Sequence, residues 1–196
     1  TVVISTASFY IMNGFIDSLK ERLYHSARNI SSGDIKIQAF QEMKPDSLQE
    51  IDKIIENHYQ TMNMLIFPNM IRKESGDSFL VSVKAVEEAY PFFGSIKLRD
   101  QVYEPLKPDE AYLAKEAADR FAIKILGSQS ILVKGVIEEL PDQGFSGGAA
   151  FNPTLLIRIE NARASGLLQF GSRVSYLKLY KGKGISQEKI EKDAEA

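Results

Sequence analysis

The first residues of the chain form an apolar run, Thr1–Ile16, which continues without a break into an amphipathic segment, Asp17–Asn29. The run is about 16 residues long, just short of the ~17–25 residues that a membrane-spanning helix needs. A secretory signal is excluded because the run lacks a basic flank and a small-residue cleavage site. We therefore expect residues 1–29 to be the outer end of a transmembrane helix that continues as a stalk helix. The alternative is an ordinary N-terminal helix that packs in the core. The apolar positions at helical spacing in this stem are Met12, Phe15, Ile16, Leu19 and Leu23.

The composition allows a folded domain with a sizeable core and excludes several kinds of site. The chain has 196 residues, of which 44% are hydrophobic and 26% charged, enough for one domain or two small lobes. Its formal net charge of −2, without a block of Lys or Arg, gives no electrostatic footprint for nucleic acid. Because the chain has no cysteine, disulfides, thiolate metal sites and cysteine nucleophiles are excluded.

Alternating and helical patterns predict an α+β unit in the first part of the chain. Residues 34–40 alternate apolar with polar side chains, as a half-buried strand does. Ser47 and Glu50 form a capping-box pattern at the start of a helix. Two further strands are predicted at 62–72 and 79–86, with a turn between them. The order strand, helix, strand, strand is typical of an α+β fold.

The pattern changes after Pro91, where short predicted strands follow one another between Gly and Pro residues. We expect residues 92–171 to form a β-rich lobe inserted into a mixed α/β lobe, which consists of residues 30–91 and 172–196. The predicted fold class is therefore α+β, preceded by the stalk helix. The predicted elements of this second part are strands at 95–98, 110–113, 130–137, 154–159 and 173–180, a small helix near 115–121, and a helix at 186–196 that begins at a Ser N-cap.

One short motif suggests a nucleophile, but its surroundings do not fit. Gly144-Phe145-Ser146-Gly147-Gly148 matches the G-x-S-x-G elbow of serine hydrolases. That elbow requires a helix after the serine and a histidine later in the chain. Here Pro153 follows soon after, and both histidines, His25 and His58, precede the serine. We therefore interpret the segment as a mobile glycine-rich loop, and keep a small esterase that uses Ser146 as a minor alternative.

No other residue pattern predicts catalysis or cofactor binding. The two histidines stand alone, without carboxylates at metal-ligand spacing. The adjacent pairs Glu87-Glu88 and Glu138-Glu139 would point to opposite faces of a strand, so neither can act as an acid/base couple by itself. We expect no catalytic residue, no cofactor and no metal.

Three methionines and a phenylalanine form a further apolar cluster in the sequence, at Met62, Met64, Met70 and Phe67. Methionine-rich clusters line some promiscuous binding surfaces, because the side chain is flexible and polarisable. Core packing is the commoner role of such residues. We expect core packing for this cluster, with a binding surface as the alternative.

Several stretches of the chain carry a resemblance to a known family. They are Ile11–Phe15 with Leu19–Arg22, Ser32–Ile37, Val83–Val86, Ala89–Gly94, Glu139–Phe145, Ser165–Leu168 and Gly171–Tyr176. In this order they resemble the extracytoplasmic domain of ABC-transporter permeases of the MacB/FtsX/LolE superfamily, and within it the YbbP-like branch. Each stretch alone is weakly specific, but together they span nearly the whole chain. One departure is the segment between Ile123 and Ser130, where the family usually has a longer turn.

The resemblance implies an architecture and a function. It implies a porter-like mixed α/β lobe with an inserted β-rich lobe, on the periplasmic side of the bacterial cytoplasmic (inner) membrane. The domain would be non-catalytic and would work by mechanotransmission, coupling ATP hydrolysis on a separate cytoplasmic ATPase subunit to export or extraction of a hydrophobic or lipid-like substrate. A second permease copy would complete a dimer, and an extracytoplasmic lipoprotein or esterase is a further expected partner. The alternative is a regulatory module that grips a lipoprotein, chaperone or hydrolase without transport.

The residues of the family motifs are expected to have structural roles. Pro91 has a fixed φ and biases the residue before it toward extended geometry, which turns the chain from one lobe into the other. Gly94 and Gly171 are expected to supply positive φ at bends. Arg173 opens a strand and has two candidate partners, Asp142 and a loop carbonyl. The remaining motif positions are Gly33, Asp34, Tyr90, Gly144, Phe145, Ser172 and Tyr176.

Overall fold

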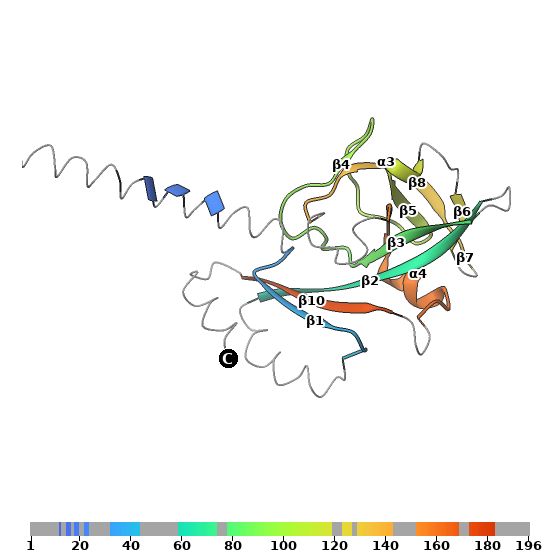
Figure 1. The fold of residues 1–196 in the computed structure, drawn as a ribbon, viewed down its shortest axis with the longest axis horizontal. Coiled ribbons are helices and arrows are strands. Elements are labelled where there is room, and N and C mark those ends of the chain that lie inside the picture. Colours follow the sequence, from blue (N-terminus) through green and yellow to red (C-terminus); the bar gives the residue numbers. More distant parts are fainter. Residues whose placement is uncertain are drawn as a thin grey trace, which may run out of the picture.

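A ten-stranded mixed sheet with few helices makes up the centre of the computed structural model (Figure 1). The structure describes residues 12, 15–16, 18–19, 22–23, 32–43, 59–73, 78–118, 123–126, 129–142, 152–168 and 173–182. The elements are β1 (Ile35–Ala39), β2 (Tyr59–Lys73), β3 (Ser78–Val86), β4 (Lys97–Leu98), β5 (Glu110–Ala114), α3 (Lys115–Ala118), β6 (Ile123–Leu126), β7 (Gln129–Ser130), β8 (Leu132–Glu139), β9 (Thr154–Arg158), α4 (Ile159–Ala164) and β10 (Ser175–Gly182).

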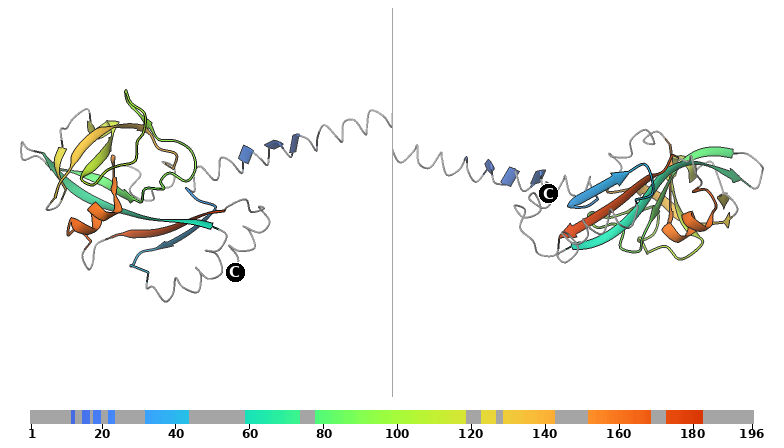
Figure 2. Two further views of the ribbon diagram at one scale, coloured as in Figure 1. Left: turned by 180° about the vertical axis from the view of Figure 1, so that it is seen from behind. Right: turned by 90° about the horizontal axis from the view of Figure 1, so that it is seen from below.

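The strand order places β3 in the middle of the sheet. The order is β1-β10-β2-β3-β9-β5-β8-β4, and β6 and β7 extend it from β2. The pairs β3–β9 and β5–β8 are parallel, whereas the other pairs are antiparallel. Figure 2 shows β1, β10 and β2 side by side in blue, red and teal. The strands drawn from residues 92–171 join the others in this one sheet through β9 and β6; the division into two lobes stays a prediction.

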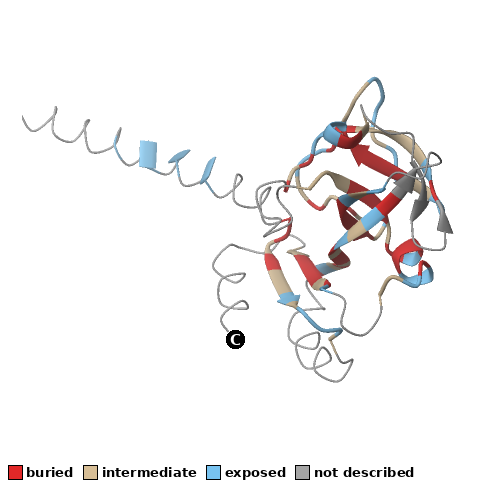
Figure 3. Ribbon diagram, turned by 45° about the vertical axis from the view of Figure 1, so that its right-hand side comes forward, coloured by how far each residue is buried: buried red, intermediate tan, exposed pale blue. Residues whose placement is uncertain are grey.

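Side chains on the two faces of the sheet form two main cores. Every residue of β3 from Val81 to Val86 is buried, which is typical of a central strand covered on both faces. The first core contains Leu65, Phe67, Ile71, Val81, Val83, Ala85, Ala111, Leu113, Ala117, Ile131, Leu155, Ile157, Ile159, Ala162 and Val174. The second contains Met62, Met64, Val86, Tyr90, Phe92, Ile96, Leu106, Tyr112, Ile137, Leu140, Leu156, Leu177 and Leu179. Figure 3 shows the buried residues concentrated along the strands.

Most of the predicted strands are found, with shifted ends. β1, β2, β3, β5, β8, β9 and β10 correspond to strands predicted from the sequence. The strand predicted at 154–159 ends at Arg158, because Ile159 already begins α4, which the sequence analysis did not predict. The short segment after Ile123 is the antiparallel β6–β7 hairpin, with Leu126 opposite Gln129. The helices predicted after Ser47 and at 186–196 lie outside the described residues.

The described stem residues are helical, and their side chains lie away from the sheet. Met12, Phe15, Ile16, Leu19 and Leu23 are between 39% and 66% exposed. Figure 1 shows their blue segments at a distance from the strands. A helix that packs in the core of this chain is therefore excluded for these five positions. Within the described residues, no helix is both long and apolar enough to cross a membrane.

Candidate functional site

The carboxylate of Asp142, in the turn after β8, is contacted by one ammonium group and two hydroxyl groups. The Lys84 ammonium, from β3, forms an ion pair with Asp142 Oδ2. The Ser32 hydroxyl donates a hydrogen bond to the same oxygen, and the Tyr90 hydroxyl donates to Oδ1 at 2.9 Å. All four side chains are buried. We refer to these four residues as the Asp142 cluster.

The position of Lys84 explains why the cluster needs an anion. Lys84 lies in the central strand between Ile66 of β2 and Leu156 of β9. An unpaired ammonium in such an apolar place would be very costly, because burial removes its hydration. Asp142 supplies the opposite charge, and the Tyr90 ring adds a cation–π contact, with Lys84 Nζ 5.0 Å from the ring centroid.

Burial and pairing both shift the pKa values of the cluster. Burial by itself raises the pKa of Asp142, but the Lys84 charge and the hydrogen bonds from Lys84, Ser32 and Tyr90 bring it below its ordinary value of 3.8. Burial, and then the Asp142 charge, raise the pKa of the Tyr90 phenol well above its ordinary value. Burial lowers the pKa of Lys84, although Asp142 opposes this shift. At neutral pH Asp142 is therefore ionised and Tyr90 is a neutral donor.

The Asp142 cluster joins the segment before β1 and the segment after β8 to the central strand, β3. Ser32 precedes β1, Lys84 lies on β3, and Asp142 follows β8. β3 is three pairing steps from β1, through β10 and β2, and three from β8, through β9 and β5. The contacts between these residues therefore bring the segment before β1 and the segment after β8 to the same place beside β3.

Beside the cluster, the start of β1 is bound to the end of β10. The Asp34 backbone N–H donates to the Tyr180 carbonyl at 2.8 Å, and the Gly182 N–H donates to Asp34 Oδ2 at 2.8 Å. At Gly33, a Cβ atom would lie 3.2 Å from the Ile35 carbonyl oxygen and 3.3 Å from that of Tyr180. A side chain at this position would therefore be tightly packed against the backbone of the two strands, which glycine avoids.

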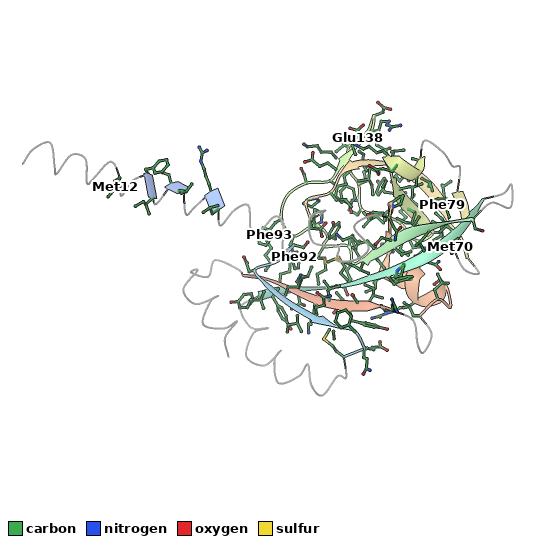
Figure 4. The ribbon with its side chains drawn as sticks, viewed as in Figure 1. Met12, Met70, Phe79, Phe92, Phe93 and Glu138 are labelled. Carbon is green, nitrogen blue, oxygen red and sulfur yellow. The ribbon has the colours of Figure 1, made fainter. Side chains whose placement is uncertain are left out.

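The end of β10 also contacts the segment that follows Pro91. Lys181 Nζ donates to the Phe92 carbonyl at 2.9 Å. It lies 5.9 Å from the centroid of the Phe92 ring and 5.1 Å from that of Phe93. Figure 4 shows the two phenylalanines on the side of the sheet nearest the stem. Three segments far apart in the sequence, before β1, after β3 and at the end of β10, are thus held together.

The structure brings several of the motif residues together. Gly33, Asp34, Tyr90 and Asp142 lie in or next to the Asp142 cluster. Gly94 has φ 75°, which confirms the positive φ predicted for it. The Tyr90-Pro91 peptide bond is cis. Tyr176 of β10 is partly buried against the first core.

One predicted pairing is wrong, and several predicted positions lie outside the described residues. The pairing of Arg173 with Asp142 is wrong: Arg173 is exposed, whereas the buried Asp142 is bonded to Lys84 on the central strand. Arg173 remains a candidate for a loop carbonyl. Gly144, Phe145, Gly171 and Ser172 lie outside the described residues, as do Ser146, His25 and His58.

Sequence reasoning did not single out Lys84 and Ser32. A signal for Lys84 was present, because it is the one charge in the otherwise uncharged strand Ser78–Val86. A lysine in a strand that is buried on both faces needs an anionic partner. Ser32 belongs to the motif stretch Ser32–Ile37, but no local pattern predicted its bond to Asp142, which is 110 positions away.

The methionine cluster divides between core and surface. Met62 and Met64 are buried in the second core and Phe67 in the first, so core packing is confirmed for these three. Met70 is 53% exposed, which makes core packing wrong for this residue. Within the described part of the chain, no group of three or more His, Asp or Glu side chains is arranged to hold a metal ion.

Comparison with known proteins supports a permease relationship. No family model matches the chain. The uncharacterized ABC transporter permease YbbP of Escherichia coli (strain K12) is 23% identical over 179 residues, which are 88% of this chain and 21% of the relative. The chain is similar to an ABC transporter permease. It spans about a fifth of that relative, so the whole relative is much longer than the part that matches.

One solved structure has a similar fold. The extracellular domain of the noncanonic ABC-type transporter YknZ from Gram-positive bacteria matches with a TM-score of 0.50 and 11% identity, over 77% of this chain and 78% of that one. A domain of a proposed permease protein from Porphyromonas gingivalis has a TM-score of 0.46 and 13% identity, over 74% of this chain and 70% of that one. The similarity to YbbP confirms the predicted resemblance to ABC-transporter permeases, and the YknZ extracellular domain shares the fold.

Proposed function

We propose that the chain is the extracytoplasmic domain of a bacterial ABC-transporter permease at the cytoplasmic membrane. In this proposal a separate cytoplasmic ATPase hydrolyses ATP, and the domain responds mechanically, without catalysis of its own. The observation that carries the proposal is the exposed apolar stem ahead of a sheet with the fold of the YknZ extracellular domain. The similarity to YbbP supports the same class of protein.

The stem suits the transmission of a displacement. Its described residues are helical, and a helix is stiffer along its axis than an extended linker. Its apolar side chains remain uncovered by the sheet, with Phe15 66% and Leu23 62% exposed. These side chains are available to lipid or to neighbouring helices of the same transporter.

The two ends of the sheet domain support an insertion between membrane segments. The start of β1 and the end of β10 are hydrogen-bonded neighbours, through Asp34, Tyr180 and Gly182. A domain whose chain enters and leaves at one place can be moved by two adjacent membrane helices. We further propose that two copies act as a dimer on a hydrophobic or lipid-like substrate, with an extracytoplasmic lipoprotein or esterase as a further partner, as the family resemblance implies.

A distance measurement tests this function. The full-length permease with its ATPase, in lipid nanodiscs, carries a spin label at Val102→Cys, a position that is 86% exposed. The distance between the labels of the two copies is expected to change between the nucleotide-free and ATP-bound states. An ATPase variant that cannot bind nucleotide is the control. The proposal fails if the wild-type distance distribution is the same in both states.

A further inference from the structure

We infer that the hydrogen bond from Ser32 to Asp142 carries displacement of the stem directly to the far end of the sheet, at β8 and β4. The inference rests on the proposed function for the source of the displacement. It adds the route and names Ser32 as a positioning residue, which acts through Asp142. The donor and the acceptor are both buried, at 5% exposure each.

The first step is the place of Ser32 in the chain. In the sequence it lies between the described stem residues and β1, and we propose that it moves with the stem. Its φ is 64°, a left-handed conformation that residues other than glycine seldom adopt. Such conformations persist where surrounding contacts hold them, and they are often found at functional positions. The bond to Asp142 is a contact of this kind.

The second step is the length of the two routes across the sheet. Among the described strands, the ladder from β1 reaches β8 through β10, β2, β3, β9 and β5. The route through Ser32 reaches Asp142 in one hydrogen bond, and Asp142 lies just beyond the last β8 residue, Glu139. A movement of β8 would be shared by β4, because Lys97 of β4 lies opposite Glu139 of β8 in the strand register and forms an ion pair with it.

The third step is that the hydrogen bond from Ser32 can be removed while the other contacts of Asp142 remain. Asp142 keeps the ammonium of Lys84 and the hydroxyl of Tyr90 if Ser32 is absent. The buried charges therefore remain compensated, which is the condition for a folded variant. Substitution of Ser32 separates the stem side of the cluster from the β8 side, whereas substitution of Asp142 disrupts both.

The end of the sheet that receives the displacement is exposed. Lys97–Glu139 and Arg99–Glu138 form ion pairs on its surface, with side chains 37% to 65% exposed. Figure 4 shows Glu138 on a different side of the sheet from Phe92 and Phe93, which lie nearest the stem. A movement of β8 and β4 would therefore change a surface that lies away from the described stem residues.

Hydrogen–deuterium exchange on this chain tests the link without any ATPase. Ser32→Ala is expected to speed amide exchange in β8 and β4 about tenfold, and more than in β2 and β9, which lie between them and β1. Ser32→Gly, which removes the hydroxyl but suits the positive φ, is expected to give the same pattern. The matched control is Ser82→Ala, a buried serine for which the structure shows no bond to Asp142. Faster exchange confined to residues 32–39, or fading strand by strand from β1, would overturn the inference.

A second measurement separates this inference from the proposed function. In the full-length permease with its ATPase, label distances from Val102→Cys are compared between wild type and Ser32→Ala. If the wild type responds to ATP and Ser32→Ala keeps ATP hydrolysis but loses most of the response, the link is supported. If the variant responds as the wild type does, the link is wrong and the function stands. If the wild type does not respond, the function fails, and the exchange result alone decides whether Ser32 couples the two ends.

Discussion

At the scale of single residues, the charge of Asp142 is the most consequential feature of the sheet. Asp142→Asn leaves the Lys84 ammonium buried without an anion, which typically costs about 3–5 kcal/mol. We expect a loss of this size in the free energy of unfolding, measured by urea titration. Lys84→Met with Asp142→Asn is the control, and it should lose less, because no charge then remains buried. An unchanged urea midpoint in Asp142→Asn would contradict the role of the ion pair.

The same carboxylate predicts a dependence of stability on pH. Because its pKa is lowered below the ordinary 3.8 in the folded chain, its contribution is complete above that value. As the pH falls below about 4, the unfolded chain takes up the proton first, so the contribution is lost progressively toward the folded pKa. The stability difference between wild type and Asp142→Asn should therefore narrow in acid. Urea midpoints at pH 6 and pH 3 measure it, and a difference that widens in acid would oppose this assignment.

At the scale of elements, the contact of β1 with β10 depends on Gly33. Its missing Cβ would lie against two carbonyl oxygens and 3.4 Å from Leu179 Cβ, and backbone atoms cannot move aside as a flexible side chain can. We expect Gly33→Ala to destabilise the fold by about 1–3 kcal/mol, as overpacking does. Gly166→Ala is an informative comparison, because nothing lies near its Cβ position and its cost comes from φ 70° alone. Amide exchange should accelerate in β1 and β10 for Gly33→Ala only.

At the scale of the whole molecule, the stem and the sheet contribute separately. Phe15→Ser with Leu19→Ser should change the free energy of unfolding of the sheet by less than about 0.5 kcal/mol, because both side chains are exposed. The same change should reduce binding to liposomes, measured by flotation. Ile35→Ser is the control, since Ile35 is 8% exposed and its loss should destabilise the sheet. A large loss of stability in the stem variant would mean that the stem packs on the domain.

Local sequence patterns were sufficient to locate most strands but insufficient to predict which strands pair with each other. Alternation located β1, because a half-buried strand exposes its two faces in turn, and apolar runs bounded by turn residues located β2 and β3. Neither pattern could show that β3 pairs in parallel with β9, or that α4 follows β9 directly, because these choices depend on what covers each strand. Met70 was expected in the core and is exposed for the same reason: its burial depends on what covers that part of β2.

The apolar stem, the α+β pattern and the order of motifs that resembles permease extracytoplasmic domains were predictable from the sequence, because these features depend on spacing along the chain. The pairing of Asp142 with Lys84 rather than with Arg173 was not predictable, because it depends on the fold. That pairing depends on the fold, which brings together Ser32 before β1, Lys84 in β3 and Asp142 after β8. Because the Lys84 ammonium is buried there, leaving it unpaired would be costly, and the anion that the fold places beside it is Asp142, far away in the sequence.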